Sequence, residues 1–417
     1  MQYRRVLVVA VAAVTTVALA AGCSSSKSSG GGGRGPITFV TGKDTSGVWP
    51  AIAQQWNAAH PNEKVTVKQQ SDQADQQHDD IVQHMQAKDP GYDIVTVDVI
   101  WTAEFAAKGW LEPLKGQYAI DTSAMLGGPV KAATYNGTMF AAPFASDGGL
   151  LYYRKDLVPT APTTWSELIS DCAKKTSGMG CYGGQFSQYE GLTCNAVESI
   201  YGAGGVVVKS DGKTPDVNTP QATEGLNFLV NGFKQGYIPK EAITWTEEPS
   251  REAFQSGKLL FLRNWPYVYA HLTGDANSQV KDKFGVAPLP GSSGLGTSTL
   301  GGHSAAISVY SKHKATAFDF LKFIETPDIQ LNQFLKVGTL APVLKAPYTD
   351  ASAIAKFPYL PTLQKSIDTA IPRPVSPFYP AITQSIQTNV YQALQGSLPV
   401  ASALQNIQAG ITKAAGG

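Results

Sequence analysis

The chain has 417 residues, of which 16% are charged and 10% aromatic, and its formal net charge is +1. The charges form no long run of either sign, which argues against a nucleic-acid partner, because nucleic acids bind basic patches. A chain of this length exceeds what one hydrophobic core supports, so we expect two domains of about 150 to 200 residues each. The 7 Trp and 17 Tyr residues supply flat amphipathic rings, which line clefts for polar ligands as well as cores.

Residues 1–22 have the layout of a secretory signal peptide, with Arg4 and Arg5 placed before an uncharged apolar run. The run is shorter than the roughly 18 residues of a membrane-spanning helix. Residues 20–23 (Ala-Ala-Gly-Cys) resemble the lipobox of bacterial lipoproteins, which implies a lipidated Cys23 at the mature N-terminus. An ordinary cleaved signal followed by an incidental cysteine is the alternative.

The segment after the signal is rich in Ser and Gly, and we assign residues 23–35 to the lipidated cysteine and a flexible tether. Several acyl chains on Cys23 would hold the protein on a membrane, since each buried CH₂ contributes about 0.8 kcal/mol. We therefore expect a lipid-anchored protein on the extracytoplasmic face of the cell membrane.

Strands and helices alternate through the first part of the folded chain. Strands are expected at residues 36–42, 65–71 and 93–101, and helices at residues 47–61 and 75–90. Such alternation is typical of a parallel sheet with helices on both faces. Residues 140–158 break the rhythm with an Ala-Pro entry and a Gly-Gly pair inside a strand-like run. We interpret this segment as the crossing into a second lobe.

The second lobe is expected to alternate again. Helices are predicted at residues 163–175, 189–205, 219–237 and 247–258, and strands at residues 181–186 and 259–265. Residues 284–311 predict a loop-rich return to the first lobe, where a helix is expected at residues 314–325. The chain from Thr326 onward is expected to be helical with irregular breaks.

Three cysteines remain after Cys23, in a compartment where disulfides persist. Cys172 lies in a predicted helix and Cys181 begins the next predicted strand, so a short loop separates them. We predict that these two form a disulfide, which contributes roughly 3 kcal/mol in the loop-entropy estimate. Cys194 is expected to be a buried free thiol. The sequence has no paired CxxC motif, so no metal site is predicted.

Motifs for catalysis are incomplete. Residues 211–214 (DGKT) match only the end of a phosphate-binding loop, and residues 302–306 (GHSAA) only part of a nucleophile elbow. Paired carboxylates occur at Asp79-Asp80 and Glu247-Glu248. A glycosidase needs two carboxylates across one bond. A lipid-anchored, secreted glycoside hydrolase is therefore one functional hypothesis.

Six segments in order resemble the extracellular solute-binding lipoproteins (family 1) of carbohydrate ABC importers, and most of all the trehalose- and maltose-type sugar-binding proteins. These segments span residues 93–114, 140–158, 184–192, 251–272, 284–291 and 371–382, and contain DVIWTAEFA, the AFQSGK helix, an NWPY turn and a late RPVSPFY segment. A TEE segment, residues 246–248, precedes the AFQSGK helix. The match covers essentially the whole mature chain.

The resemblance implies a periplasmic-binding-protein-like fold of type II, with two α/β lobes, each a mainly parallel sheet flanked by helices, and a hinge between them. We assign residues 36–145 and 300–325 to the N-terminal lobe, and residues 146–299 and 326–417 to the C-terminal lobe. The implied function is capture of an α-linked disaccharide and its delivery to ABC permease subunits. A monomeric binding protein is expected, with no cofactor and no enzymatic activity.

A disaccharide site needs carboxylates, amides and an arginine for the hydroxyls, and an aromatic plane for the ring faces. Trp265 is the residue expected to stack on a sugar ring, with a core indole as the alternative. Arg373, fixed between Pro372 and Pro374, is expected to bind hydroxyls. A solvated loop arginine is the alternative for Arg373.

Carboxylates are expected from both lobes. Asp98 ends a buried strand, and ligands of open α/β sheets bind beyond the carboxyl ends of strands; a helix N-cap is its alternative. Asp147 matches the crossover position where the family carries Asn or Asp on the ligand, and an Asx turn is its alternative. Asp44 matches the family's first-lobe loop, where a turn residue is nearly as well supported.

The remaining candidates follow from the resemblance. Either acid of the TEE segment fits, and Glu248 is favoured over its neighbour. Gly302 would let the backbone approach the ligand, since it has no side chain. Trp101 is a second ring platform or a core residue. Two further candidates open a helix after GQFSQ, namely Tyr189 and Glu190.

Overall fold

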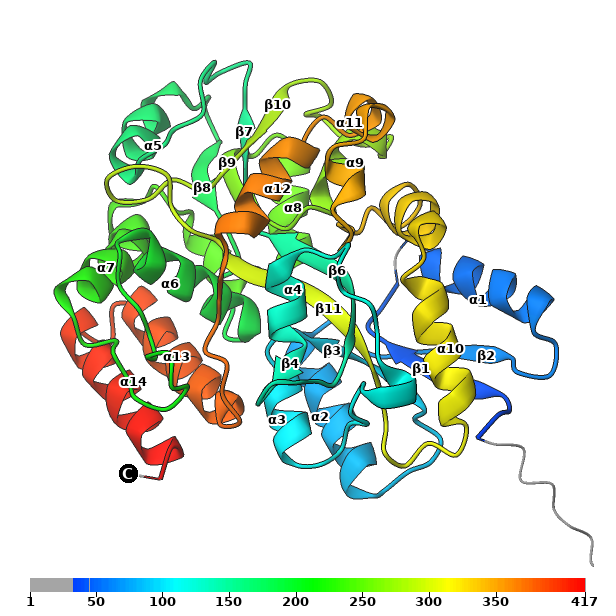
Figure 1. Ribbon diagram of the computed structural model, residues 1–417. Coiled ribbons are helices and arrows are strands. Elements are labelled where there is room, and N and C mark those ends of the chain that lie inside the picture. Colours follow the sequence, from blue (N-terminus) through cyan, green and yellow to red (C-terminus); the bar gives the residue numbers. More distant parts are fainter. Residues whose placement is uncertain (1–32, 45, 417) are drawn as a thin grey trace, which may run out of the picture.

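The computed structural model describes residues 33–44 and 46–416 and shows two α/β lobes joined by several crossing segments (Figure 1). The signal peptide, the lipidation site Cys23 and most of the expected tether lie outside the described residues. The end of the tether is held in place, because Arg34 forms ion pairs with Glu63 (2.9 Å) and Asp319 (2.7 Å). Residues 33–35 therefore belong to the folded part of the first lobe.

The first lobe contains a sheet of order β12-β11-β3-β1-β2, with β6 also paired to β11. The strand β1 runs parallel to β2 and β3, whereas β11 is antiparallel to β3 and β6. The strands are β1 (Ile37–Thr41), β2 (Val65–Gln69), β3 (Ile94–Asp98), β6 (Ala142–Gly148), β11 (Thr299–Ile307) and β12 (Ile371–Pro372).

Helices cover both faces of this sheet. Helix α1 buries Val48, Ile52 and Trp56, whose spacing of four places them on one side of the helix. The elements of this lobe are α1 (Val48–Ala59), α2 (Ala74–Gln86), α3 (Thr102–Ala107), η1 (Gly116–Tyr118), α4 (Gly127–Ala132), the hairpin β4 (Thr134–Tyr135) and β5 (Thr138–Met139), α10 (Lys314–Ile324) and the π-helical η4 (Ile329–Leu335).

The second lobe contains a sheet of order β10-β7-β9-β8. Its strands are β7 (Leu150–Arg154), β8 (Gly180–Gly183), β9 (Leu259–Asn264) and β10 (Phe284–Ala287). The helices around it are α5 (Trp165–Asp171), η2 (Cys172–Lys174), α6 (Glu190–Gly202), α7 (Pro220–Gln235), η3 (Lys240–Thr244), α8 (Glu247–Gln255), α9 (Val268–Gly274), η5 (Ala346–Tyr348), α11 (Ala351–Lys356), α12 (Leu360–Thr369), α13 (Tyr379–Leu394) and α14 (Val400–Ala414).

The direction of strand pairing in the second lobe differs from the expectation of a mainly parallel sheet. Strand β7 is antiparallel to both β10 and β9, and only β8 runs parallel to β9. The parallel expectation rests on strand–helix–strand units within one sheet. Strand β7 instead enters directly from the first lobe, with only Gly149 between it and β6. Its direction is therefore set by this crossing, because no helix of the described residues connects it to a preceding strand of the same sheet.

The lobes are joined at crossings that contact one another. Gly149 separates β6 from β7, and its N–H donates to the Ser298 hydroxyl (2.6 Å), just before β11. The Ser366 hydroxyl of α12 donates to the carbonyl of Gly149 (2.9 Å). We call Gly149, Ser298 and Ser366 the hinge cluster.

Helix η4 packs in the first lobe, although the sequence assigned all residues after 325 to the second. The ring of Phe334 lies 5.3 Å from that of Trp49 in α1 and 5.5 Å from that of Phe144 in β6. The apolar side chains of η4 are buried against α1 and β6. The sequence did not place η4 correctly because a helical pattern does not show which lobe the helix packs on.

The cysteines lie as expected. Cys172 and Cys181 form a disulfide between η2 and β8, which confirms the predicted pair. Cys194 is a buried free thiol in α6. No helix of the described residues is long and apolar enough to cross a membrane.

Candidate ligand-binding site between the lobes

Arg373 occupies the boundary between the lobes. It directly follows β12, and its side chain is only 2% exposed. One guanidinium nitrogen donates to Asp98 of the first lobe (3.0 Å) and another to Glu190 of the second lobe (2.5 Å). Three of the predicted site residues are thus brought together, and one arginine ties both lobes. The Nε atom of Arg373 is buried without a hydrogen-bond partner in the described residues.

Glu190 is the buried acid of this group, at the first position of α6. It accepts hydrogen bonds from Arg373, from Thr383 (2.6 Å) and from the hydroxyl of Tyr379. Burial raises the pKa of Glu190 to about 7, although these partners favour the ionised form. The carboxylate is therefore fixed from several sides.

Asp98 ends β3, as predicted. The N-cap of α3 is Trp101, without a side-chain cap, so Asp98 does not have the capping role left open by the sequence. Trp101 itself is buried and lies near the rings of His78 and Phe105 (5.6 and 6.2 Å between centroids). This tryptophan is a core residue and no second ring platform.

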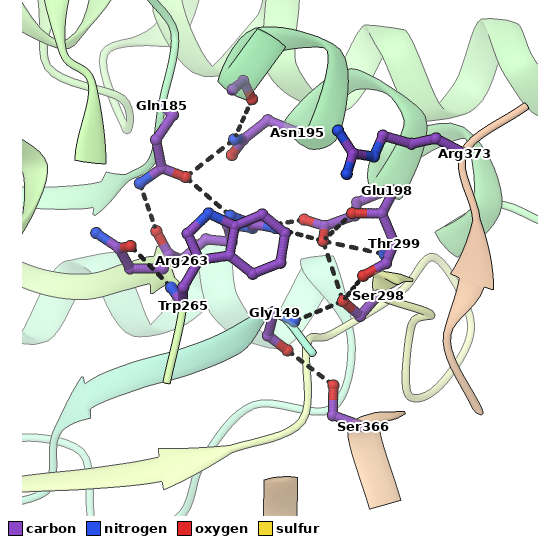
Figure 2. A network of polar contacts seen from close by, with 12 residues as sticks. Gly149, Gln185, Asn195, Glu198, Arg263, Trp265, Ser298, Thr299, Ser366 and Arg373 are labelled. Atoms are coloured by element: carbon purple, nitrogen blue, oxygen red, sulfur yellow. Dashed lines mark hydrogen bonds and ion pairs between the residues drawn. The ribbon is translucent and has the colours of Figure 1, made fainter. Parts of the chain in front are cut away.

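Trp265 directly follows β9 and is partly buried. The guanidinium carbon of Arg263 lies 3.9 Å from the centroid of its ring. A Cβ atom on Gly301 would approach the ring to 2.9 Å, so the indole lies close to the backbone of β11. Figure 2 shows the indole beside Arg263 and the polar network of the second lobe.

The Arg263–Glu198 pair was not predicted. Arg263 is 1% exposed and binds both carboxylate oxygens of Glu198 (2.6 and 2.5 Å), as well as Gln185 (2.9 Å) (Figure 2). Glu198 also accepts from the backbone N–H (3.1 Å) and the hydroxyl (3.0 Å) of Thr299 in β11. A charged residue inside the apolar strand LLFLRN was the signal in the sequence, since buried charges are paired.

Asp147 lies in β6 of the first-lobe sheet, although the sequence assigned residues from 146 onward to the second lobe. Its carboxylate has no hydrogen bond among the described residues, so the Asx turn left open by the sequence is not formed. Burial raises its pKa to about 6; the nearby charge of Asp98 acts in the same direction, and His303 and Arg263 oppose it. An acceptor at a lobe boundary without an internal partner is available to a hydroxyl donor.

The two acids of the TEE segment have different surroundings. The hydroxyl of Tyr189 donates to Glu247 (2.5 Å), and burial raises the pKa of Glu247 although Tyr189 and Arg263 favour its charged form. Glu248 accepts from Arg251 (2.7 and 2.9 Å) and from Tyr267 (2.6 Å). Glu247 therefore lies with the predicted site residue Tyr189, whereas Glu248, the favoured candidate, is held by Arg251 and Tyr267.

Asp44 has a local structural role. Its carboxylate accepts from the N–H groups of Ser46 and Gly47 (both 2.9 Å) and of Trp49 (2.9 Å). It thereby caps the start of α1 together with the Ser46 hydroxyl, which accepts from the N–H of Val48 (3.3 Å). These contacts correspond to the turn residue that the sequence left as the alternative.

Gly302 is required by the sheet. Its φ is +112°, and a Cβ atom there would lie 2.3 Å from the carbonyl oxygen of Ala145. The neighbouring register shift between β11 and β6 explains this close approach. The neighbouring Gly301, and not Gly302, is the glycine whose backbone lies against the Trp265 ring.

Metal-ligand geometry is not found in the described part of the chain, where no group of three or more His, Cys, Asp or Glu side chains could hold an ion. The arrangement between the lobes consists instead of carboxylates, two arginines and an indole. These groups can bind hydroxyls and the face of a ring.

Residues 42–331 match the family model described as bacterial extracellular solute-binding protein. The chain belongs to this family. A probable ABC transporter-binding protein of Deinococcus radiodurans is 29% identical to this solute-binding protein over 352 residues, which are 80% of the chain and 82% of the relative. A maltotriose-binding protein of Pyrococcus abyssi is 25% identical over 306 residues, or 71% of the chain and 64% of the relative.

Among solved structures, maltose-bound MalE3 of T. maritima is 32% identical to this solute-binding protein, with a TM-score of 0.85 over 91% of the chain and 99% of that protein. The family match and this structural similarity confirm the predicted family and the two-lobed type II α/β fold.

Proposed function

We propose that this solute-binding protein is the substrate-binding component of an ABC sugar importer. It captures an α-linked disaccharide of the maltose or trehalose type between its lobes and delivers it to the permease. The observation that carries the proposal is the pairing of Arg373 with an acid from each lobe. A ligand that binds both lobes stabilises the closed form through its higher affinity for that form.

The chemistry between the lobes suits a sugar. Asp147 has a carboxylate without a hydrogen-bond partner among the described residues, and Arg373 has a free buried donor at Nε. Sugar hydroxyls can donate to the first and accept from the second, and each unpaired buried polar group otherwise costs about 1 to 3 kcal/mol. The Trp265 indole offers the apolar surface that a pyranose face needs.

The relatives support the choice of ligand class. The solved structure at 32% identity contains maltose, and the Pyrococcus abyssi relative is named for maltotriose. Trehalose and maltose carry the same functional groups and differ in the geometry of their linkage. Direct binding measurements therefore decide between these two sugars.

The glycoside hydrolase alternative needs two carboxylates facing one glycosidic bond. Asp79 is 76% exposed, while Asp80 accepts from the hydroxyl of Tyr92 (2.8 Å). Glu248 is paired with Arg251. Asp79 is therefore open to solvent, while Asp80 and Glu248 are each held by a neighbouring side chain, and the incubation described below tests hydrolysis directly.

Calorimetric titration of the mature protein with trehalose, maltose, sucrose and glucose tests the proposal. We expect saturable binding of maltose or trehalose that is tighter than binding of glucose. Parallel incubation with each disaccharide and analysis of the products should show no released glucose. Absence of binding to every sugar would contradict the proposed function, and released glucose would favour the hydrolase.

We also propose that Cys23 carries the lipid anchor on the extracytoplasmic face of the membrane and that the protein acts as a monomer beside its permease. Substitution Cys23→Ala should release a protein that still binds sugar from the membrane fraction. Fractionation of cells followed by titration measures both properties. Full retention of the variant in membranes would contradict the anchor.

A further inference from the structure

Helix α2 of the first lobe meets helix α13 of the second lobe at a polar contact. The amide nitrogen of Gln387 lies 3.4 Å from a carboxylate oxygen of Asp75. The same amide donates to the hydroxyl of Thr383 (3.1 Å), and Gln387 is only 8% exposed. A buried amide of one lobe is thus directed at a carboxylate of the other.

Asp75, a residue of α2, also lies close to the N-terminus of the second-lobe helix α6. The N-cap of α6 is Tyr189, whose side chain does not cap the helix. The backbone N–H of Glu190 stabilises the charged form of Asp75. Burial raises the pKa of Asp75, and the contacts with Gln387, His78 and Glu190 oppose this rise. The backbone N–H of Glu190, in the first turn of α6, therefore favours a negative charge on Asp75.

The contact extends the network of the ligand site. Thr383 donates to Glu190 (2.6 Å), and Glu190 accepts from Arg373, which binds Asp98 (3.0 Å). The second-lobe network thus reaches the first lobe at two places, namely at the end of β3 and at the start of α2. No motif of the sequence indicates a role for Asp75 or Gln387 at this second place.

We propose that Asp75 and Gln387 form an interlobe latch, which stabilises the closed arrangement and thereby increases affinity for the captured ligand. The proposal that the latch aids sugar capture rests on the proposed function. Both residues act as positioning residues, because the contact joins the lobes and disappears when they separate. Loss of the latch lowers the population of closed protein, and the apparent ligand affinity falls with it.

Small-angle scattering of the sugar-free protein tests the latch without any ligand. Asp75→Ala, Gln387→Ala and the double variant should each have a larger radius of gyration than the wild type. The matched controls are Asp79→Ala, an exposed acid of the same helix, and Gln384→Ala, an exposed amide one turn before Gln387. Both controls should keep the wild-type radius. Equal radii for all proteins would overturn the latch.

Titration of the same proteins with maltose tests the role in capture. Each latch variant should bind about fivefold more weakly, and the double variant should be no weaker than the singles, since contacting residues are not additive. If the loss of affinity in the double variant equalled the product of the two single losses, the two residues would act independently, and the proposed latch between them would be wrong. Unchanged affinity despite larger radii would overturn the role in capture.

The two proposals fail in different ways. If no variant and no wild-type protein binds maltose or trehalose, but the latch variants expand, the proposed function fails and the latch remains. If the wild type binds maltose and the latch variants neither expand nor lose affinity, the latch fails alone. Thermal unfolding of every variant confirms that each protein is folded under the conditions used.

Discussion

Trp265 combines two features that distinguish a cleft residue from a core residue. Its ring is partly buried, with Arg263 over one face and the bare backbone of Gly301 at its edge. We predict that Trp265→Ala removes measurable sugar binding but lowers the melting temperature only slightly. A tryptophan packed fully in the core would instead cost about 3 to 5 kcal/mol on truncation. Calorimetric titration and thermal melting of one purified variant separate the two outcomes.

The acids of the TEE segment allow a matched comparison. Glu247→Gln should weaken sugar binding about tenfold or more, because charged acceptors form the stronger hydrogen bonds to hydroxyls. Glu248→Gln should leave binding within about twofold, since its carboxylate is occupied by Arg251 and Tyr267 and is 45% exposed. Titration of both variants measures the contrast. The reverse order would assign the site to Glu248.

Asp147 makes stability depend on pH. Its pKa is raised from 3.8 to about 6 in the folded protein, so the folded state holds the proton more tightly than the unfolded state. The folded protein therefore loses stability as the pH rises from about 4 to about 6, and the loss is complete above that range. Asp147→Asn should raise the melting temperature at about pH 8, with a gain that vanishes below about pH 4. A gain independent of pH would contradict this assignment.

At the scale of residues, some candidates followed from physical arguments and others only from the resemblance. Asp98 at the end of a buried strand and Arg373 between two prolines are of the first kind and Glu190 of the second, and the structure brings the three together. The partner of a buried charge is not visible in a sequence, so the Arg263–Glu198 pair was missed. Two adjacent acids on a helix also differ by about 100° in direction, and residue type does not show which one faces the ligand.

Among the elements, the crossing between β6 and β7 leaves little room for a side chain at Gly149. A Cβ atom on Gly149 would lie 2.7 Å from a carboxylate oxygen of Glu198 and 3.0 Å from Arg263. Gly149→Ala should therefore destabilise the fold by about 1 to 3 kcal/mol through overpacking. Chemical denaturation measures the change in the free energy of unfolding.

The control for this variant is Gly274→Ala at the end of α9, where a Cβ atom would meet nothing within 4 Å. This substitution should change the free energy of unfolding by less than about 0.5 kcal/mol. Equal effects of the two substitutions would show that the close approach of Glu198 and Arg263 does not control stability at Gly149.

Strands and helices were predictable where the spacing of apolar residues along the chain determines them. Alternating strands and helices were expected in the first lobe, and β1, β2 and β3 do pair in parallel. Strand directions in the second lobe and the position of η4 were not predictable, since both depend on where the chain returns between lobes. Residue 45 and residues 1–32 lie outside the described structure, so the signal peptide and the tether stay predictions.

For the whole molecule, the sequence indicated the two-lobed fold because six motifs occur in family order along the chain. The family match and the similarity to maltose-bound MalE3 confirm the fold and the family. The identity of the sugar could not be predicted in this way, because it depends on sub-ångström placement of hydroxyl partners on both lobes. Besides the hinge cluster, Arg373 and the contact between Asp75 and Gln387 link the lobes, and we therefore predict a ligand held between them.

The central claim is that a disaccharide is bound by both lobes at once. A crystal structure of the mature protein with the disaccharide selected by calorimetry tests this claim most directly. The account predicts a pyranose ring on the Trp265 indole, with hydroxyls hydrogen-bonded to a first-lobe carboxylate, Asp98 or Asp147, and to Glu247 of the second lobe. A sugar bound to one lobe alone, or away from Trp265, would contradict the account.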